Sequence, residues 1–418
     1  MKLTRAILGV ATGLVAGYAA ARAVEAMGPA PDPVVEGNKE AAAYARARRA
    51  LEIAGTIRGM AGLIAFAYGP LGNAVDGATL RLPVWARPAA YLGAFSVACA
   101  LVELPASLVE GYTLERRFGL SDQSKDAWLS EYVKSSALGA AVTAAIATIF
   151  GVAVRRAPRL WPLLAAIGTL PLLVLANVIV PIYVLPLFNT FEPVDGSLEA
   201  RLRRLASRFG VGDAAILRMD MSRQTRKANA FVTGIGRTHR IVLGDTLIAS
   251  FPENETEFVV AHELGHYVNR DTWRIIAVGE VLATFLFLAA NAATPRKQRE
   301  ELRDRAILLA RFYALMVVAM QGLRPLLFAF SRGREWAADR FALAATGDAP
   351  AGASAFRRLR DQNLADEDPP LWYEIFFSSH PSLRARIAAL EGFRNGDPVT
   401  KAPATDESAA TPQDPSSA

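Results

Sequence analysis

Cysteine and histidine are the residues that this sequence has least of. Its 418 residues include one cysteine, Cys99, and four histidines. A single cysteine excludes an intrachain disulfide framework and a zinc site built from cysteine thiolates. Because histidines are so few, two of them at a regular spacing carry more information here than in an average chain.

The basic residues do not follow a nucleic-acid-binding pattern. The net charge is +6 and the isoelectric point is about 9.5. However, the lysines and arginines cluster between apolar runs, where such residues usually anchor a chain to lipid headgroups. We therefore expect the lipid bilayer, and no nucleic acid, among the partners of this protein.

Long apolar runs dominate the composition, since 52% of the residues are hydrophobic and the mean hydropathy is +0.21. Seven runs approach the length of about 20 residues that a helix needs to cross a bilayer. We predict a mostly α-helical, polytopic membrane protein with about seven transmembrane helices. The runs cover roughly residues 5–24, 50–70, 88–110, 135–154, 160–187, 275–293 and 305–330.

The first run has features of both a signal peptide and a membrane span. Lys2 and Arg5 accompany its start, and a proline-rich segment follows it. Its apolar part lasts about 20 residues, which is longer than the core of a signal peptide, so the span is favoured over the cleaved peptide.

Several predicted spans contain charged residues. Arg58, Glu103, Glu110 and Glu280 lie in the second, third and sixth runs. Charged side chains in a bilayer usually face the interior of a helix bundle or a water-filled cavity. The alternative is that the runs are shorter and that some of these charges reach the headgroups.

A long polar interval, from about residue 189 to 274, separates the fifth and sixth spans. In it, Ser197–Phe209 predicts an amphipathic helix, and Ala230–Thr233 and Arg240–Leu243 predict the two strands of a hairpin. Glu253–Val268 predicts a further helix, because a proline precedes it and acidic residues fill its first turn.

This last helix contains His262-Glu263-Leu264-Gly265-His266. Residues four apart lie one above the other on a helix, so both imidazoles can bind one metal ion. Zinc suits imidazole and carboxylate ligands and lowers the pKa of a bound water to about 7. Glu263 is then placed to accept the proton of that water as a general base and to pass it to the leaving amine. The alternatives are a pair of surface histidines or a metal site without catalysis, although a structural zinc site would have no use for Glu263.

A catalytic zinc needs a third protein ligand and an open position. Glu335 is the candidate, in what the pattern predicts as a new helix just after the last span. Asp339 lies on the same helix face and could orient a ligand histidine. For both residues the alternative is a solvated face with ion pairs to neighbouring arginines. Two membrane crossings separate the metal helix from Glu335, so both lie on one side of the bilayer, and one Zn²⁺ per chain is predicted, bound by His262, His266 and Glu335.

Two loop residues are further candidates for catalysis. Asn229 starts the predicted hairpin and could donate a hydrogen bond to the oxyanion formed during peptide cleavage. His380, in Ser379-His380-Pro381-Ser382, could do the same or orient the substrate. From the residues alone, an ordinary loop role is favoured for both. The strand beside Asn229 could also pair with an extended substrate.

The predicted organisation has five regions. They are transmembrane helices 1 to 5 in 1–188, a membrane-adjacent catalytic region in 189–274, transmembrane helices 6 and 7 in 275–330, a C-terminal catalytic region in 331–394, and a disordered tail in 395–418.

Blocks of sequence along most of the chain resemble, in the same order, those of the CAAX prenyl protease type 1 family of integral-membrane zinc metalloproteases. Together these blocks are more specific than the metal motif alone. They are Phe118-Gly119-Leu120, Pro186-Leu187-Phe188-Asn189 with Phe191 and Pro193, Asn229-Ala230-Phe231, Arg240-Ile241-Val242-Leu243, Asp245-Thr246-Leu247, His262 to His266, Glu335 to Asp339, and His380-Pro381.

The resemblance implies a barrel of seven helices around a water-filled chamber, with a small zincin-like α+β catalytic domain that faces the cytosol. It implies that Glu335 is the third ligand, that Asn229 and His380 contact the intermediate, and that Asp339 supports a ligand histidine. Family members cleave near the carboxy terminus of prenylated proteins that carry a C-terminal cysteine motif. Arg386 falls where the family often has an arginine.

The alanine- and arginine-rich composition is typical of a high-GC bacterium, and bacteria generally do not farnesylate proteins. We therefore expect a zinc metalloendopeptidase of a bacterial inner membrane that acts on peptides or proteins, lipidated or otherwise membrane-bound, with its site facing the cytoplasm. Charge alone does not set this orientation, because Arg296–Arg299 favours the opposite side, whereas Arg46–Arg49 and Arg116–Arg117 favour the cytoplasmic one.

Two other functions remain open at this level. A zinc-binding transporter or channel without protease activity would explain charges such as Arg58, Glu103 and Glu280 within the spans. An inactive scaffold would explain the membrane helices alone, but the intact Glu263 argues against it.

Overall fold

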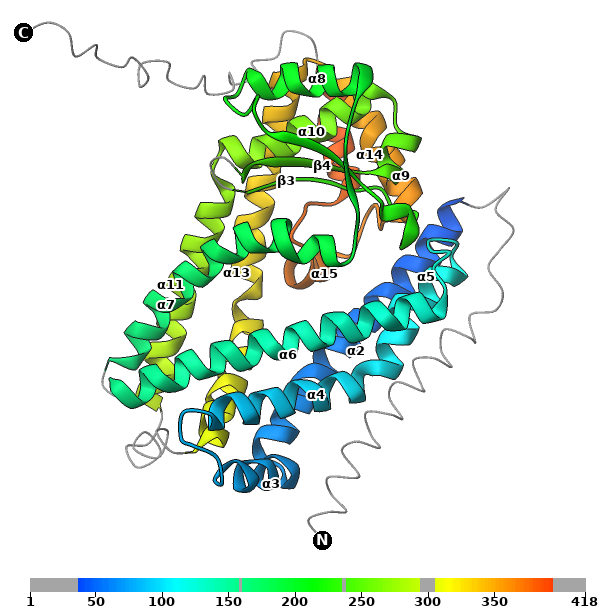
Figure 1. The fold of residues 1–418 in the computed structure, drawn as a ribbon. Helices are drawn as coiled ribbons and strands as arrows, with labels where there is room; N and C mark the ends of the chain where they lie inside the picture. The colour runs from blue at the N-terminus through cyan, green and yellow to red at the C-terminus, as the bar shows by residue number, and fades with distance from the viewer. Residues whose placement is uncertain (1–36, 158–159, 235–237, 294–304, 394–418) are drawn as a thin grey trace, which may run out of the picture.

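The computed structural model describes residues 37–157, 160–234, 238–293 and 305–393. Long helices form one part of the protein, and a compact mixed α/β region sits at one end of them (Figure 1). The first predicted span, the C-terminal tail and the tip of the predicted hairpin at 235–237 lie outside the described residues.

Five helices of the described chain have the length and apolar character of membrane spans, and a bent helix pair makes a sixth if it is counted as one span. Five are unbroken, and the sixth bends by 40° where α7 continues into a π-helical turn. Pro181 lies in this turn and lacks the backbone N–H that a regular helix needs. The spans are α2 (Gly37–Tyr68), α4 (Arg87–Leu108) with η1 (Val109–Thr113) and α5 (Leu114–Arg117), α6 (Lys125–Arg156), α7 (Trp161–Ile179) with η2 (Val180–Val184) and η3 (Leu185–Leu187), α11 (Asp271–Ala293) and α13 (Ala306–Thr346), and the short α3 (Pro70–Thr79) connects α2 and α4.

Large apolar side chains point outward from these helices. Leu101, Ile167 and Val281, on α4, α7 and α11, are 67–69% exposed. An apolar surface of this kind is unfavourable in water and favourable against lipid chains. The outward faces therefore fit an integral, multi-pass membrane protein, and they match the second to seventh predicted runs.

The charges inside the spans have polar partners. Arg58 on α2 donates to Glu103 at 2.6 Å and to Glu110 at 3.1 Å, which ties α2 to α4 and η1. Glu280 on α11 accepts a hydrogen bond of 2.7 Å from Thr169 on α7. Pairing of this kind lowers the cost of a charge within a bilayer and links neighbouring helices.

The last span and the segment that carries Glu335 are one helix. The prediction that a new helix starts near Glu335 is wrong, because α13 runs unbroken for 41 residues. Only Gly333 in the intervening segment disfavours a helix, and a helix tolerates a single glycine. At 1.5 Å per residue, α13 is about 60 Å long, roughly twice the thickness of the hydrocarbon layer. One rigid element therefore belongs to both the bundle and the mixed region.

The mixed region contains a four-stranded sheet with strand order β1-β2-β4-β3. β3 pairs antiparallel with β4, so that Ala230 lies opposite Leu243, which confirms the predicted hairpin strands. β2 runs parallel to β4, and β3 has one strand neighbour among the described residues, so it forms an edge. The strands are β1 (Phe191–Pro193), β2 (Ala215–Met219), β3 (Ala230–Thr233) and β4 (Arg240–Gly244).

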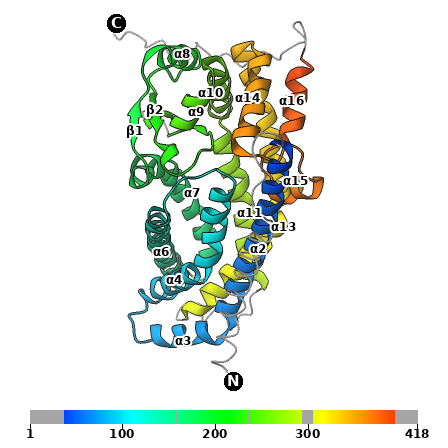
Figure 2. The ribbon, with the colours of Figure 1, turned by 90° about the vertical axis from the view of Figure 1, so that its right-hand side faces the viewer.

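Helices surround this sheet, and the predicted helices at 197–209 and 253–268 are confirmed as α8 and α10. α10 contacts β3, α13 and α14, so it lies between the sheet and the other helices of this region (Figure 2). The short turn η4 follows β2. The elements are α8 (Gly196–Ser207), η4 (Met221–Arg223), α9 (Asp245–Ser250), α10 (Glu253–Val268), α14 (Ala349–Asn363), α15 (Leu371–Phe377) and α16 (Leu383–Glu391).

Asp76 of α3 anchors the start of α13 and should stabilise the fold. Its buried carboxylate accepts hydrogen bonds from Arg305 Nε at 2.6 Å and from the backbone N–H of Ile307 at 3.0 Å. Because the first amides of a helix have no intrahelical partner, we expect Asp76→Ala to destabilise the protein by about 1–3 kcal/mol. Thermal unfolding in detergent would measure this. Asn73→Ala is the control, since Asn73 is bonded to Gly69 in the adjoining turn, and equal unfolding temperatures for both variants would contradict the expectation.

Candidate metal centre

α10 and α13 bring two imidazoles and one carboxylate together. The Nε2 atoms of His262 and His266 lie 3.2 Å apart, and each is 3.4 Å from an oxygen of Glu335. Ligand atoms bound tetrahedrally at about 2.05 Å from one metal ion are about 3.3 Å from one another. The two nitrogens therefore have the separation of neighbouring ligands in a metal-centred tetrahedron. Of the Glu335 carboxylate, Oε2 is the oxygen near His262 and Oε1 the oxygen near His266, and one ligand atom from each of the three residues lies within 4.8 Å of the others.

The hydrogen bonds of the two imidazoles direct their Nε2 atoms to this point. His262 Nδ1 is 2.8 Å from Asp339, and His266 Nδ1 is 3.0 Å from Asp271. A neutral imidazole that donates through Nδ1 presents an unprotonated Nε2 as a ligand. One oxygen of Glu335, Oε2, is buried without a hydrogen-bond partner. These donors fit a divalent metal ion.

The electrostatics of the pocket also favour a cation. Burial lowers the pKa of the His266 imidazole, but Asp271 and Glu335 outweigh burial and raise it to about 10. A pocket that stabilises an imidazolium this strongly also stabilises a metal cation, which competes with the proton for the same nitrogen.

Asp271, which the sequence reasoning missed, holds the second imidazole. It is 1% exposed, starts α11, and its second oxygen lies 2.7 Å from Arg334 Nε. Arg270 immediately before it has φ 56°, a left-handed conformation that is costly for a residue other than glycine. An acidic residue just after the second histidine, at the start of the next helix, was the available sequence signal.

Asp339 is held on its other side by Arg386 of α16. The buried guanidinium donates to both carboxylate oxygens, at 2.6 and 2.8 Å. A bidentate pair of this kind fixes the plane of the carboxylate, and Asp339 in turn orients His262. Arg384, by contrast, lies near Asp368 at the surface.

The glycine of the motif is needed for the approach of the two helices. A Cβ atom on Gly265 would lie 3.1 Å from both Ala338 Cα and Phe341 Cδ1. Larger residues at this crossing would push α10 away from α13 and would therefore separate the histidines from Glu335.

Glu263, Asn229 and His380 line one cavity of about 380 Å³ together with His262. Burial raises the pKa of the Glu263 carboxyl above its ordinary value, although the neighbouring imidazoles oppose this. A raised pKa suits a general base that works near neutral pH. His380 Nε2 lies 3.3 Å from Glu335 Oε1. The structure thus brings all seven predicted site residues into one place.

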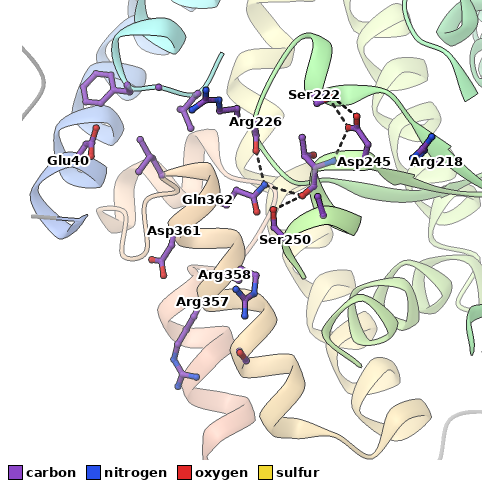
Figure 3. Close-up of a pocket in the computed structure, with 17 residues that line it drawn as sticks. Glu40, Arg218, Ser222, Arg226, Asp245, Ser250, Arg357, Arg358, Asp361 and Gln362 are labelled. Atoms are coloured by element: carbon purple, nitrogen blue, oxygen red, sulfur yellow. Dashed lines mark hydrogen bonds between the residues drawn. The ribbon is translucent and has the colours of Figure 1, made fainter. Parts of the chain in front are cut away.

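A larger cavity of about 1030 Å³ lies elsewhere, between α9, α14 and the loop after α5. Its lining includes Arg226, Asp245 and Gln362, and none of the three metal-site side chains (Figure 3). Of these two cavities, it is the smaller one that His262 and Glu263 line.

Two family models cover successive parts of the chain. The family model described as "CAAX prenyl protease N-terminal, five membrane helices" matches residues 36–190. That of peptidase family M48 matches residues 193–394, which include the whole metal centre.

Individual relatives share most of the chain. The Arabidopsis thaliana CAAX prenyl protease 1 homolog is 30% identical, over 70% of this chain and 70% of its own length. The uncharacterized metalloprotease YhfN of Bacillus subtilis is 27% identical, over 77% of this chain and 79% of its own. The crystal structure of Ste24p from S. mikatae has the same fold, with a TM-score of 0.75, 23% identity, and coverage of 93% of this chain and 99% of its own.

Asp271 should be needed for tight metal binding. Asp271→Asn keeps the size of the side chain but removes the charge that orients His266, so we expect metal affinity to fall by about 10- to 100-fold. Competition with a chromophoric chelator would measure the affinity. The control is Asp213→Asn, because Asp213 is exposed. If the two variants bind metal with equal affinity, Asp271 does not support metal binding.

Proposed function

We propose that this chain, which belongs to the CAAX prenyl protease 1 family of M48 membrane metallopeptidases, is a zinc endopeptidase with His262, His266 and Glu335 as its ligands. The observation that carries the proposal is the cluster of ligand atoms beside Glu263, in which the two Nε2 atoms lie 3.2 Å apart and each lies 3.4 Å from one oxygen of the Glu335 carboxylate. Two imidazoles from a His-Glu-x-x-His helix and one carboxylate from a second helix are a ligand set for catalytic zinc. When bound, zinc supplies Lewis acidity and lowers the pKa of a water molecule.

Glu263 acts as the general base in this proposal. Its carboxylate accepts a proton from the attacking water and then delivers that proton to the departing amine. The raised pKa of the carboxyl helps the second transfer, because a stronger base holds the proton until the amine takes it.

Asn229 and His380 stabilise the oxyanion that forms on the scissile carbonyl. Both line the cavity with Glu263 and approach it from different elements, the segment before β3 and the loop between α15 and α16. The Asn229 amide and the N–H group of the His380 ring are hydrogen-bond donors suited to a developing negative charge.

The substrates are peptides or proteins that reach the site from the membrane. The spans and the metal centre share α13, so a chain held by the bilayer can extend into the cavity. The charges that motivated a transport function, Arg58, Glu103 and Glu280, have partners within the protein, whereas Glu263 has a role only in hydrolysis.

Glu263→Gln should abolish cleavage and leave metal binding intact. The amide cannot accept the proton, so we expect the rate of peptide hydrolysis by the detergent-purified protein to fall by about 10²- to 10⁴-fold. Two matched peptides, one farnesylated at a C-terminal cysteine motif and one not, should be tested with and without a zinc chelator, and bound metal should be measured in parallel.

The outcomes separate the interpretations. Chelator-sensitive cleavage of the farnesylated peptide alone would indicate a prenyl-protein protease. Chelator-sensitive cleavage of both peptides would indicate a broader membrane peptidase. If Glu263→Gln cleaves as fast as the wild type, the proposal is wrong. Uptake of zinc by proteoliposomes that depends on His262, without any cleavage, would favour a transporter.

We expect the metal centre to face the cytoplasm of a bacterial inner membrane. An epitope at the C-terminus, which follows the catalytic region without a further span among the described residues, should then be resistant to protease added outside spheroplasts. It should be digested in inverted vesicles, and the reverse pattern would assign the opposite orientation.

A further inference from the structure

The residues that lead into β3, Ala228 and Asn229, line the metal cavity, and a side chain covers the outer edge of the chain at Ala228. In an antiparallel pair, alternate residues direct their backbone groups to the partner strand and away from it. The carbonyl of Asn229 accepts from the Gly244 N–H at 2.9 Å, so Asn229 faces β4. By this alternation, Ala228, Ala230 and Val232 direct their N–H and C=O groups to the free edge.

Asn363 occupies the free-edge positions of Ala228. The Ala228 N–H donates to Asn363 Oδ1 at 2.8 Å, and Asn363 Nδ2 donates to the Ala228 carbonyl at 3.1 Å. One carboxamide thus satisfies both groups as the peptide of a neighbouring strand would. Asn363 also lines the metal cavity, together with Asn229 and Glu263.

The end of α14 holds this carboxamide in place. Asn363 is the last residue of the helix, and Leu364 after it has φ 47°, a position usually taken by glycine. The side chain of Leu364 packs against a cluster that includes Tyr44 and Leu114. A strained turn that is stabilised by burial fixes its neighbour in one orientation.

We propose that Asn363 is a positioning residue that ends the substrate-pairing edge, so that an extended substrate pairs with Ala230 and Val232 but not with Ala228. This inference rests on the proposed function. Because Asn363 occupies the backbone N–H and carbonyl of Ala228, the substrate strand can pair with the edge in one register only. That register determines which peptide bond lies at the metal. If the backbone groups of Ala228 were free to pair, the substrate strand could shift by two residues, because a shift of two keeps the same side chains on the same face.

Mapping of the cleavage sites by mass spectrometry tests the proposal. With the unmodified and farnesylated peptides, we expect Asn363→Ala to give a second product that is cut two residues from the first and makes up at least about a tenth of the total. Metal content should stay unchanged. A single, wild-type cleavage site in this variant would overturn the proposal.

Gln362→Ala is the matched control. Gln362 is the preceding residue of α14 and also bonds the same segment, through the carbonyl of Arg226 at 2.8 Å, but it lies in the larger cavity (Figure 3). If Asn363 only anchored the segment before β3, the two variants would give the same cleavage products. We expect Gln362→Ala to retain the wild-type cleavage site, and the same second product in both variants would overturn the proposal.

Amide hydrogen exchange gives a test that does not require Asn363→Ala to fold. In Glu263→Gln, the amide of Ala228 should be protected without peptide, whereas those of Ala230 and Val232 should become protected when peptide is added. An unprotected Ala228, or no change at Ala230 and Val232 with peptide bound, would contradict the proposal. If the wild type cleaves neither peptide, the proposed function fails, and the exchange pattern still decides the part of Asn363.

Discussion

The close crossing of α10 and α13 is the constraint on which the rest of this structure depends. The metal ligands come from two helices that are separated in sequence by a membrane hairpin, and they meet because Gly265 lets the helices approach to within contact of their backbones. The crossing places the two Nε2 atoms 3.2 Å apart and each of them 3.4 Å from an oxygen of the Glu335 carboxylate. Any residue that widened it would separate the ligands by more than one metal ion can bridge.

Burial of so many charged groups at this crossing requires that each has a partner. Asp339 lies between His262 and Arg386, and Asp271 lies between His266 and Arg334. Each imidazole is therefore oriented by a carboxylate that is itself held by an arginine. This arrangement fixes the tautomers of both histidines and keeps the desolvation cost of the carboxylates low.

The length of α13 couples the membrane bundle to the metal centre. Its first turn is attached to α3 through Asp76, and its last turns hold Glu335 and Asp339. One continuous helix therefore connects the packing within the membrane bundle to the third ligand. The edge of β3, by contrast, belongs to the sheet. In the proposed function the substrate lies between β3, which pairs with it, and α13, which supplies Glu335.

Sequence periodicity and local motifs determined much of this description. The apolar runs located the spans, because their length reflects the thickness of a bilayer, and a preceding proline with acidic residues in the first turn located the start of α10. The spacing of His262, Glu263 and His266 identified the metal helix, because positions four apart share a helix face. The count of membrane crossings made Glu335 a candidate third ligand, the family blocks supported it, and the resemblance alone pointed to Arg386.

Only the tertiary structure decided how distant residues meet. Nothing local indicates that α13 continues through Glu335, since a glycine between arginines is compatible with a helix or a break. Asp271 and Asn363 look like ordinary acid and amide residues in the sequence, and their partners, the His266 imidazole and the Ala228 peptide, are chosen by packing. Sequence determined the chemical groups and the local helices, because these follow from short-range periodicity. Tertiary structure decided the pairings, because hydrogen bonds between distant segments depend on where the whole chain places them.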